Sequence, residues 1–309
     1  MILRDQVNKV GGFKNLPFLA KQVVEGFISG MHKSPFHGFS AEFAEHKIYN
    51  PGESTKHIDW KLFAKTDKLY TKKYDDETNL RCHIIIDNSS SMHYPVQKEQ
   101  SIDHLNKIGF SVLASATIMH MLKKQRDAVG LSVYSDNYDF YSQEKGSERH
   151  YSMLMGQLEK VVNNPSQTVH TDTHKHLHLI AEKLHRRSLV IVFTDLFQST
   201  KSQDELFESL RHLKHNKHEV VVFHVVDKAQ ELEFNFSNTP KRFKDIETGE
   251  EIDLYADQIK DAYKKALNAY VTEFKLKCGQ NRIKYSLVDC KSNFDKILSR
   301  YLIERQKIN

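Results

Sequence analysis

Carboxylate and hydroxyl side chains gather directly after an apolar run at residues 83–87. Asp87, Ser89 and Ser91 have the spacing D-x-S-x-S within the segment Asp-Asn-Ser-Ser-Ser-Met. Where a loop continues a strand, alternate residues can point to one side, so one carboxylate and two hydroxyls would face a common point. Oxygen donors of this kind suit Mg²⁺ or Mn²⁺ in octahedral geometry. The spacing therefore predicts one half of a cation site.

Two later segments offer groups of the same kind. A second apolar run ends in Thr194-Asp195, and residues 168–173 place several threonines just before a helical pattern. Ligands of open parallel sheets bind at the carboxyl ends of the strands, near the point where the strand order reverses. Asp and Ser also favour turns and helix caps, and taken alone the D-x-S-x-S segment fits that interpretation better. Its position after a buried strand, together with the second Thr-Asp end, favours a site.

These loops need a sheet to bring them together, and the sequence from residue 81 onward predicts one. Apolar β-branched runs without every-second-residue polarity are typical of strands buried on both faces. Their alternation with helical patterns predicts an α/β fold with a mostly parallel, Rossmann-like central sheet flanked by helices over residues 81–309. The predicted strands are 83–87, 129–134, 189–195, 220–227 and 283–289, and the predicted helices are 101–124, 147–162, 173–186, 203–216, 256–279 and 293–306.

The first 80 residues follow a different pattern. A helical pattern over residues 16–31 precedes aromatic and turn-rich segments, in which Asn50-Pro51-Gly52 is a turn signal between short strand-like runs. An insertion at residues 230–252 is similar, with EFNF and RFKDI as short strands and Thr248-Gly249 as a hairpin turn. We predict that residues 1–80 and this insertion together form a small β-rich module.

Composition excludes several classes of protein. The 309 residues include only 12 Gly and 6 Pro, which indicates mostly regular structure, and a net charge of +5 spread along the chain does not favour nucleic acid as a partner. Three cysteines without a C-x-x-C pair predict neither a disulfide framework nor a zinc ribbon. No signal-peptide pattern occurs, and the most apolar stretch, 108–122, is too short for a transmembrane segment. We therefore expect a cytoplasmic protein.

The three loops together resemble the metal-ion-dependent adhesion site of von Willebrand factor type A (vWA) domains. The segments that carry the resemblance are IIIDNSSSM, the threonines before the predicted helix at 173–186, and VIVFTDL. The resemblance implies that Asp87, Ser89, Ser91, Thr171 and Asp195 hold one divalent cation, Mg²⁺ or else Mn²⁺ or Ca²⁺. It also implies that a partner's acidic side chain completes the coordination. Thr173 competes with Thr171, because Val169 and His170 stand where that family has glycines.

Residues 36–305 also resemble the bacterial Domain of Unknown Function 58 (DUF58) family. The segment EFAEHKIYNPGESTKHIDWKLF, the D-x-S-x-S strand and the D-x-E-T-G run at 245–249 carry this resemblance. It implies a bacterial, metal-dependent adaptor that acts with a MoxR-type AAA+ ATPase in protein maturation or stress response, without enzymatic activity of its own. Two alternatives stay open from the residues: a Mg²⁺-dependent phosphoryl-transfer enzyme or hydrolase, and a structural adaptor that needs no metal.

Other conspicuous residues have simpler interpretations. The single tryptophan, Trp60, is interpreted as a buried anchor between the β-rich module and the α/β domain. His174 and His178 stand four residues apart, a spacing that can hold a transition metal, but no H-E-x-x-H motif accompanies them and a solvated helix face is favoured. His224, within a predicted strand, is interpreted as a hydrogen-bonded core residue. Nucleotide-binding and esterase motifs are absent from the sequence.

Overall fold

The computed structural model describes residues 12–31, 45–48, 60–73, 80–96, 105–136, 139–163, 173–196, 200–237, 239–244 and 251–308. The chain divides into two compact units, a larger one comprising Met1–Ser29 with Leu80–Asn309 and a smaller one comprising Gly30–Asn79. Most of helix α2 (Leu16–Met31) therefore belongs to the larger unit, whereas the sequence analysis assigned it to the N-terminal module. The insertion also lies in the larger unit, and its association with the N-terminal strands stays a prediction.

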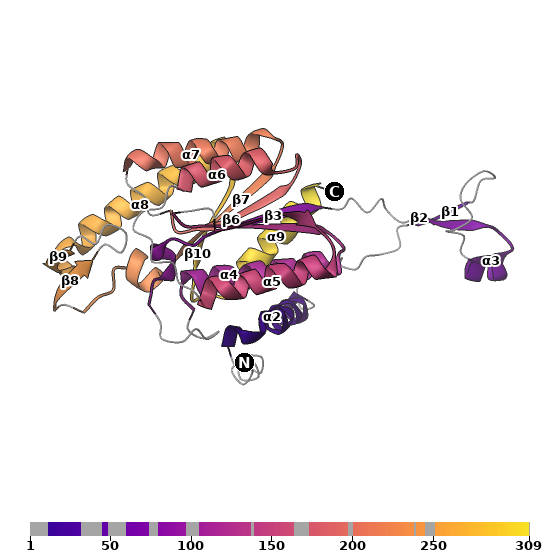
Figure 1. The fold of residues 1–309 in the computed structure, drawn as a ribbon, viewed down its shortest axis with the longest axis horizontal. Helices are drawn as coiled ribbons and strands as arrows, with labels where there is room; N and C mark the ends of the chain where they lie inside the picture. The colour runs from indigo at the N-terminus through magenta and orange to yellow at the C-terminus, as the bar shows by residue number, and fades with distance from the viewer. Residues whose placement is uncertain are drawn as a thin grey trace. The chain divides into compact units, whose positions relative to one another are not determined.

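A six-stranded sheet forms the centre of the larger unit, with the strand order β10-β7-β6-β3-β4-β5 (Figure 1). All neighbouring strands are parallel except β5, which is antiparallel to β4. The mixed α/β fold with a mostly parallel sheet is thus confirmed. The strands are β3 (Arg81–Asp87), β4 (Ala128–Tyr134), β5 (Phe140–Lys145), β6 (Leu189–Thr194), β7 (Glu219–Val226) and β10 (Lys284–Asp289).

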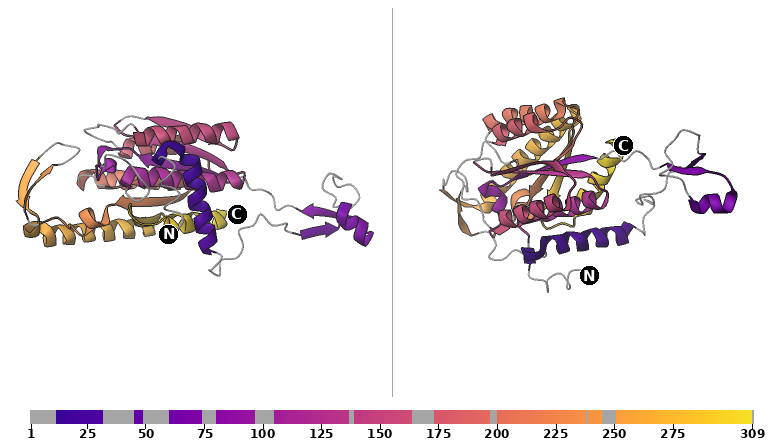
Figure 2. Two further views of the ribbon diagram at one scale, coloured as in Figure 1. Left: turned by 90° about the horizontal axis from the view of Figure 1, so that it is seen from below. Right: turned by 45° about the vertical axis from the view of Figure 1, so that its right-hand side comes forward.

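Helices cover both faces of this sheet (Figures 1 and 2). Helices α6, α7 and α8 lie on one face, and α4, α5 and α9 lie on the other, with α2 outside α4 and α5. Helix α4 is buried almost all round because it lies between the sheet and neighbouring helices. The bounds are α4 (Lys107–Lys124), α5 (Glu148–Asn163), α6 (Thr173–Lys183), α7 (Thr200–His215), α8 (Ala256–Gln280) and α9 (Asp295–Ile308).

The strand order reverses between β3 and β6. The chain passes from β3 through α4 to β4 on one side, and later returns to place β6 on the other side of β3. The carboxyl ends of β3 and β6 thus form the switch point at which open α/β sheets bind ligands. Both predicted acidic ligands lie there, since Asp87 is the last residue of β3 and Asp195 directly follows β6.

The insertion differs from its prediction. EFNF is not a strand: after β7 the chain forms a π-helical turn, η4 (Lys228–Leu232), and the hairpin consists of β8 (Pro240–Lys244) and β9 (Glu251–Tyr255). Phe234 has a φ of 49°, stacks on Phe243 and packs in a tilted arrangement against Tyr263, with ring centroids 5.6 and 4.6 Å away. These aromatic contacts take the place of strand pairing for EFNF. Thr248-Gly249 lies outside the described residues.

The smaller unit contains an antiparallel pair of strands, β1 (Glu45–Ile48) and β2 (Tyr70–Lys73), and the short helix α3 (Trp60–Thr66). The predicted pairing of short strands is confirmed, while the turn at residues 50–52 lies outside the described residues. Trp60 is 61% exposed and lies edge to face with Phe63 within this unit, and its role as an anchor between the two units stays a prediction. In the described parts of both units, no helix is long and apolar enough to cross a membrane.

Candidate functional site

Asp87 is the centre of the polar cluster at the β3–β6 switch point. Its side chain is 3% exposed, because the neighbouring strands and helices enclose the end of β3. One carboxylate oxygen accepts the backbone N–H of Ser89 at 2.9 Å, and the other accepts the Thr194 hydroxyl at 2.8 Å. The ends of β3 and β6 are therefore connected through this carboxylate. Among the described residues, no cationic side chain forms an ion pair with Asp87.

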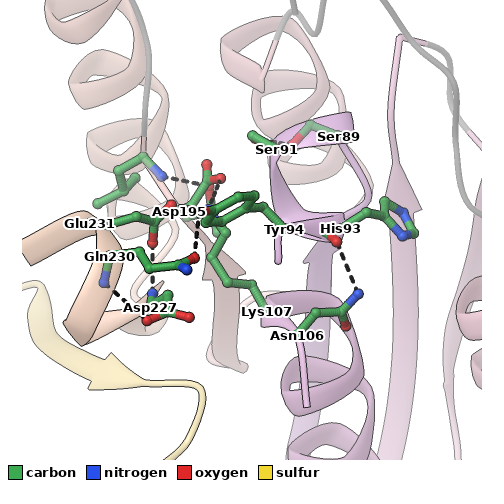
Figure 3. Close-up of polar contacts among 12 residues, drawn as sticks. Ser89, Ser91, His93, Tyr94, Asn106, Lys107, Asp195, Asp227, Gln230 and Glu231 are labelled. Atoms are coloured by element: carbon green, nitrogen blue, oxygen red, sulfur yellow. Dashed lines mark hydrogen bonds and ion pairs between the residues drawn. The ribbon is translucent and has the colours of Figure 1, made fainter. Parts of the chain in front are cut away.

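The two predicted serines lie next to Asp87 and face each other. Ser89 is buried and Ser91 half-buried, and their hydroxyl oxygens are 3.0 Å apart (Figure 3). The short 3₁₀ helix η3 (Ser90–His93) begins between them, and its first turn is closed by the Met92 N–H, which donates to the Ser89 carbonyl at 3.1 Å. The turn thus brings together two hydroxyls that an extended loop would separate.

Asp195 lies across the switch point and has a cationic partner that the sequence did not suggest. The Lys107 ammonium, from the first residue of α4, donates to the Asp195 carboxylate at 2.8 Å and to the Glu231 carboxylate at 2.6 Å (Figure 3). Lys107 is only 1% exposed, so this ion pair is shielded from water. Glu231 belongs to η4, which means that the insertion contributes directly to the cluster.

Burial and charge shift the protonation equilibria of this cluster. Burial, together with the charge of Asp195, raises the pKa of Asp87 to about 6 from an ordinary 3.8, although the hydrogen bonds from Ser89 and Thr194 oppose the rise. Burial alone would lower the pKa of Lys107, but Asp195 and Glu231 raise it above its ordinary value. Lys107 is therefore charged at neutral pH, whereas Asp87 has no cationic partner in the part of the chain that the structure describes.

The predicted threonine ligand is not placed by the structure. Thr171 lies outside the described residues, and so do the other residues at 164–172. Its competitor Thr173 is buried at the start of α6, near the Tyr134 ring. A hydroxyl that the sequence analysis did not single out, that of Thr194, reaches Asp87 instead. The four other predicted residues, Asp87, Ser89, Ser91 and Asp195, do come together at one edge of the sheet.

The oxygen atoms at this edge fit a small hard cation. Adjacent ligands of an octahedral Mg²⁺, with bonds of about 2.1 Å, lie about 3 Å apart, and the Ser89 and Ser91 hydroxyl oxygens are 3.0 Å apart. Within the described ranges, no three His, Cys, Asp or Glu side chains converge in a way that could hold a metal ion. A cation here would therefore take hydroxyl oxygens as part of its shell, which hard cations accept and soft ones do not.

A pocket of 290 Å³ opens beside the D-x-S-x-S loop. Its wall includes Asn88, Ser135 and Asp139 from the loop and the β4–β5 connection, with the last turns of α5 opposite. The Asn88 amide donates to Asp139 at 3.3 Å, and its carbonyl oxygen lies 2.9 Å from a ring nitrogen of His93. These contacts hold the backbone of the loop in place and leave space next to it.

The histidines have mainly structural contacts. His224 is fully buried in β7, 2.7 Å from the Tyr285 hydroxyl, so its interpretation as a hydrogen-bonded core residue is confirmed. The predicted solvated face of α6 is only partly right, because His176 is buried against Tyr134. His178 is half-buried, and its Nδ1 lies 2.7 Å from the Nδ1 of His212 on α7.

Comparison with known proteins places the chain in a family. Residues 45–272, about three quarters of the chain, match the family model described as "Protein of unknown function DUF58". The chain belongs to the DUF58 family. The matched range contains β1, the D-x-S-x-S loop, Asp195, the insertion and most of α8, so every element of the candidate site is part of the DUF58 region.

The individual relatives and solved structures that resemble the chain are distant. Uncharacterised proteins of Mycobacterium bovis and Mycobacterium tuberculosis are each 23% identical over 90 residues, which is 29% of this chain and 28% of theirs. Similar solved structures include the conserved hypothetical protein BatB of Bacteroides thetaiotaomicron, with 16% identity, a TM-score of 0.44 and coverage of 74% of this chain and 99% of that one. An aerotolerance-related membrane protein of Bacteroides fragilis has 14% identity, a TM-score of 0.47 and coverage of 73% and 99%.

Lys107 and Glu231 are the site residues that sequence reasoning missed. Lys107 precedes an almost entirely apolar segment, IGFSVLASATIM, and a lone charge at the edge of such a helix is a signal for a buried ion pair. Glu231 gave no signal, because it lies among charged residues in a segment that reads as a surface insertion. The contact between them joins positions 124 residues apart.

Proposed function

We propose that this protein is a metal-dependent protein-interaction module with a vWA-like α/β domain. Asp87, Ser89, Ser91 and Asp195 hold Mg²⁺, and Thr171, which lies outside the described residues, is the proposed fifth ligand. When bound, the cation supplies a coordination position for an acidic side chain of a partner protein. The chain's own residues orient the oxygen ligands, and the α/β fold keeps them together at the sheet edge.

One observation carries this proposal: the 3.0 Å spacing of the Ser89 and Ser91 hydroxyls beside the buried carboxylate of Asp87. The Asp87 carboxylate, at the end of β3, accepts hydrogen bonds from Ser89 in the turn and from Thr194 at the end of β6, and it forms no ion pair among the described residues. A divalent cation relieves that charge and the repulsion between Asp87 and Asp195.

The proposed partner is a MoxR-type AAA+ ATPase that offers an acidic side chain. The resemblance of the sequence to DUF58 proteins motivates this choice. The pocket beside Asn88 gives the partner's neighbouring residues a place to pack next to the cation. Interaction through a cation predicts that binding is reversible and depends on metal concentration.

Metal binding is tested first, with the full chain and without a partner. Mn²⁺ binding, followed by the loss of the free-ion electron paramagnetic resonance signal and by competition with Mg²⁺, should show one site. Asp87→Asn keeps the size and one acceptor of the side chain and should reduce affinity at least tenfold. Asp139→Asn, at the same edge but outside the proposed ligand set, is the matched control and should bind as the wild type does. Equal Mn²⁺ affinity in the wild type and Asp87→Asn would refute the metal site.

The partner is tested second, with a purified MoxR-type ATPase encoded by the same genome. Capture of the ATPase by the wild-type chain should require Mg²⁺ and should be lost with Asp87→Asn or excess chelator. Thr171→Ala and Thr173→Ala, compared in the same assay, decide between the two threonines. If the wild-type chain binds Mn²⁺ but captures the ATPase equally well with and without metal, the metal site stands and its role in partner binding is rejected.

A further inference from the structure

Lys107 connects the proposed cation site to the insertion. Its ammonium lies between two carboxylates, 2.8 Å from Asp195 Oδ2 and 2.6 Å from Glu231 Oε1. Asp195 belongs to the proposed cation site, whereas Glu231 belongs to η4, at the beginning of the insertion. Figure 3 shows the lysine reaching from α4 toward both groups. The side chain is 1% exposed, so its charge acts on these carboxylates and not on solvent.

The η4 turn depends on this region for its position. The second Glu231 oxygen accepts the Asp227 N–H at 2.6 Å, and the Asp227 side chain in turn accepts the N–H groups of Ala229 and Gln230 at 3.1 and 3.2 Å. Gln230 also accepts a hydrogen bond from the Tyr94 hydroxyl, just after η3. The turn is therefore held from one side by residues next to the D-x-S-x-S loop and by Lys107.

The hairpin follows from η4 through a short aromatic segment. Phe234, two residues after the turn, stacks on Phe243 of β8 and packs in a tilted arrangement against Tyr263 of α8. Phe236 meets Phe243 edge to face, with ring centroids 5.2 Å apart. A displacement of η4 would therefore reach the packing of β8, because Phe234 follows η4 by only two residues and lies against Phe243.

From these contacts we infer that Lys107 is a positioning residue that couples cation binding at Asp195 to the conformation of η4, at the beginning of the insertion. The inference rests on the proposed function. Lys107 and a divalent cation compete for the same carboxylate, since two positive groups next to Asp195 repel each other in a buried site. When the cation binds, Lys107 moves away from Asp195 and keeps Glu231, so η4 moves with it.

Two substitutions should change cation affinity in opposite directions. Lys107→Met removes the competing charge and should raise the affinity for Mg²⁺ at least tenfold. Glu231→Gln removes the carboxylate that shares Lys107 with Asp195. The ammonium should then pair more strongly with Asp195, compete better with the cation and lower the affinity for Mg²⁺ several-fold. Lys291→Met is the matched control, because Lys291 also pairs with a carboxylate at the start of the insertion, Asp227, at 2.7 Å. It does not contact Asp195 and should change the affinity less than twofold.

Hydrogen exchange of the full chain then tests the coupling. The N–H groups of Glu231, Glu233 and Asn235 donate to carbonyls of η4 or its flanks at 2.8 to 2.9 Å and report on the turn. Saturating Mg²⁺ should speed their exchange at least fivefold in the wild type and have little effect in Glu231→Gln, where the connection to Lys107 is already cut.

The experiments distinguish two failures. Absence of Mg²⁺ binding in the wild type and in Lys107→Met, both shown to be folded by circular dichroism, would reject the proposed function and this inference with it. Normal binding in the wild type, with no gain of affinity in Lys107→Met or no Mg²⁺-dependent exchange in η4, would reject the inference alone. If Lys107→Met does not fold, the loss of affinity expected for Glu231→Gln still decides the matter, and an unchanged affinity overturns the coupling.

Discussion

Replacing the proposed cation ligand Asp87 by asparagine should stabilise the protein when no metal is bound. The carboxylate is 3% exposed and lacks a cationic partner among the described residues, so its charge is unfavourable in the folded state. Residues kept for binding often cost stability in this way. Asp87→Asn removes the charge and keeps a side chain of almost the same shape.

The expected gain follows from the pKa of Asp87. A folded-state pKa of about 6, against an ordinary 3.8, is a difference of roughly two pH units at about 1.4 kcal/mol each, or about 3 kcal/mol. The hydrogen bonds from Ser89 and Thr194 favour the charged form, and their effect is already contained in that pKa. The expected gain at pH 7 is therefore about 3 kcal/mol.

The size of this difference should change with pH and with metal. Because the pKa is raised in the folded state, the penalty on the wild type is absent below the ordinary pKa and complete above pH 6. Asp87→Asn should therefore be more stable than the wild type at pH 7 and nearly equal to it at pH 4, both in chelator. Mg²⁺ at 100 times its Kd for the wild type should add about 2.7 kcal/mol to the wild type and at most about 1.4 kcal/mol to the variant, whose affinity is at least tenfold lower. The metal should thus remove at least about 1.3 kcal/mol of the variant's advantage at pH 7.

Urea unfolding followed by far-ultraviolet circular dichroism is the appropriate measurement. Trp60, the single tryptophan, lies in the smaller unit, so tryptophan fluorescence would not report on the sheet that carries Asp87. Asp139→Asn, an exposed carboxylate at the same edge, should change the free energy of unfolding by less than about 0.5 kcal/mol. A loss of 1 kcal/mol or more for Asp87→Asn in chelator at pH 7 would refute the argument that the Asp87 charge is uncompensated.

Three further predictions concern the core. His83→Leu should lower the free energy of unfolding in urea by about 3 to 5 kcal/mol, because His83 Nδ1 lies 2.7 Å from the Glu144 carboxylate, which would be left buried without its partner. The double variant His83→Leu with Glu144→Leu removes both groups and should recover at least half of that loss. Gly130→Ala should cost about 1 to 3 kcal/mol in the same assay, because its Cβ would lie 2.6 Å from His83 Nδ1 and 2.7 Å from the Ser142 carbonyl oxygen. Burial lowers the pKa of His224 to about 4, so the folded protein keeps this imidazole neutral while the unfolded chain takes up a proton below about pH 6.5. The free energy of unfolding should therefore fall by up to about 3 kcal/mol as the pH drops from 6.5 to 4, and His224→Gln should flatten that part of the stability profile.

The strands that sequence reasoning predicted are those buried on both faces. The run LVIVFT of β6 is apolar throughout, and every residue of it is buried, so composition alone identifies it. Strand β5, FYSQEK, was missed because it is an edge strand with largely exposed or half-buried residues, and its pairing with β4 depends on tertiary context. The misread EFNF segment has the composition of a strand, but packing of Phe234 among aromatic rings determines its conformation.

The candidate site was predictable to the extent that its residues are close in sequence or end a strand. The D-x-S-x-S spacing brings Ser89 and Ser91 to Asp87 within one turn, and the strand order brings Asp195 alongside. The lysine is different, because no local pattern indicates that position 107 meets positions 195 and 231. Such contacts depend on the register in which α4 and η4 pack against the sheet.

The ion pair at Lys107 also explains why Asp87, and not Asp195, is the more informative position for function. Lys107 partly neutralises Asp195 and Glu231, so these groups are compatible with a buried structure without any added ion. The Lys107 ammonium contacts the carboxylates of Asp195 and Glu231, whereas the nearby carboxylate of Asp87 accepts hydrogen bonds only from Ser89 and Thr194 among the contacts described. Asp87 forms no ion pair among the described residues, so the fold alone does not compensate its buried charge. A bound cation would compensate it, and substitutions at Asp87 therefore test for the cation most directly.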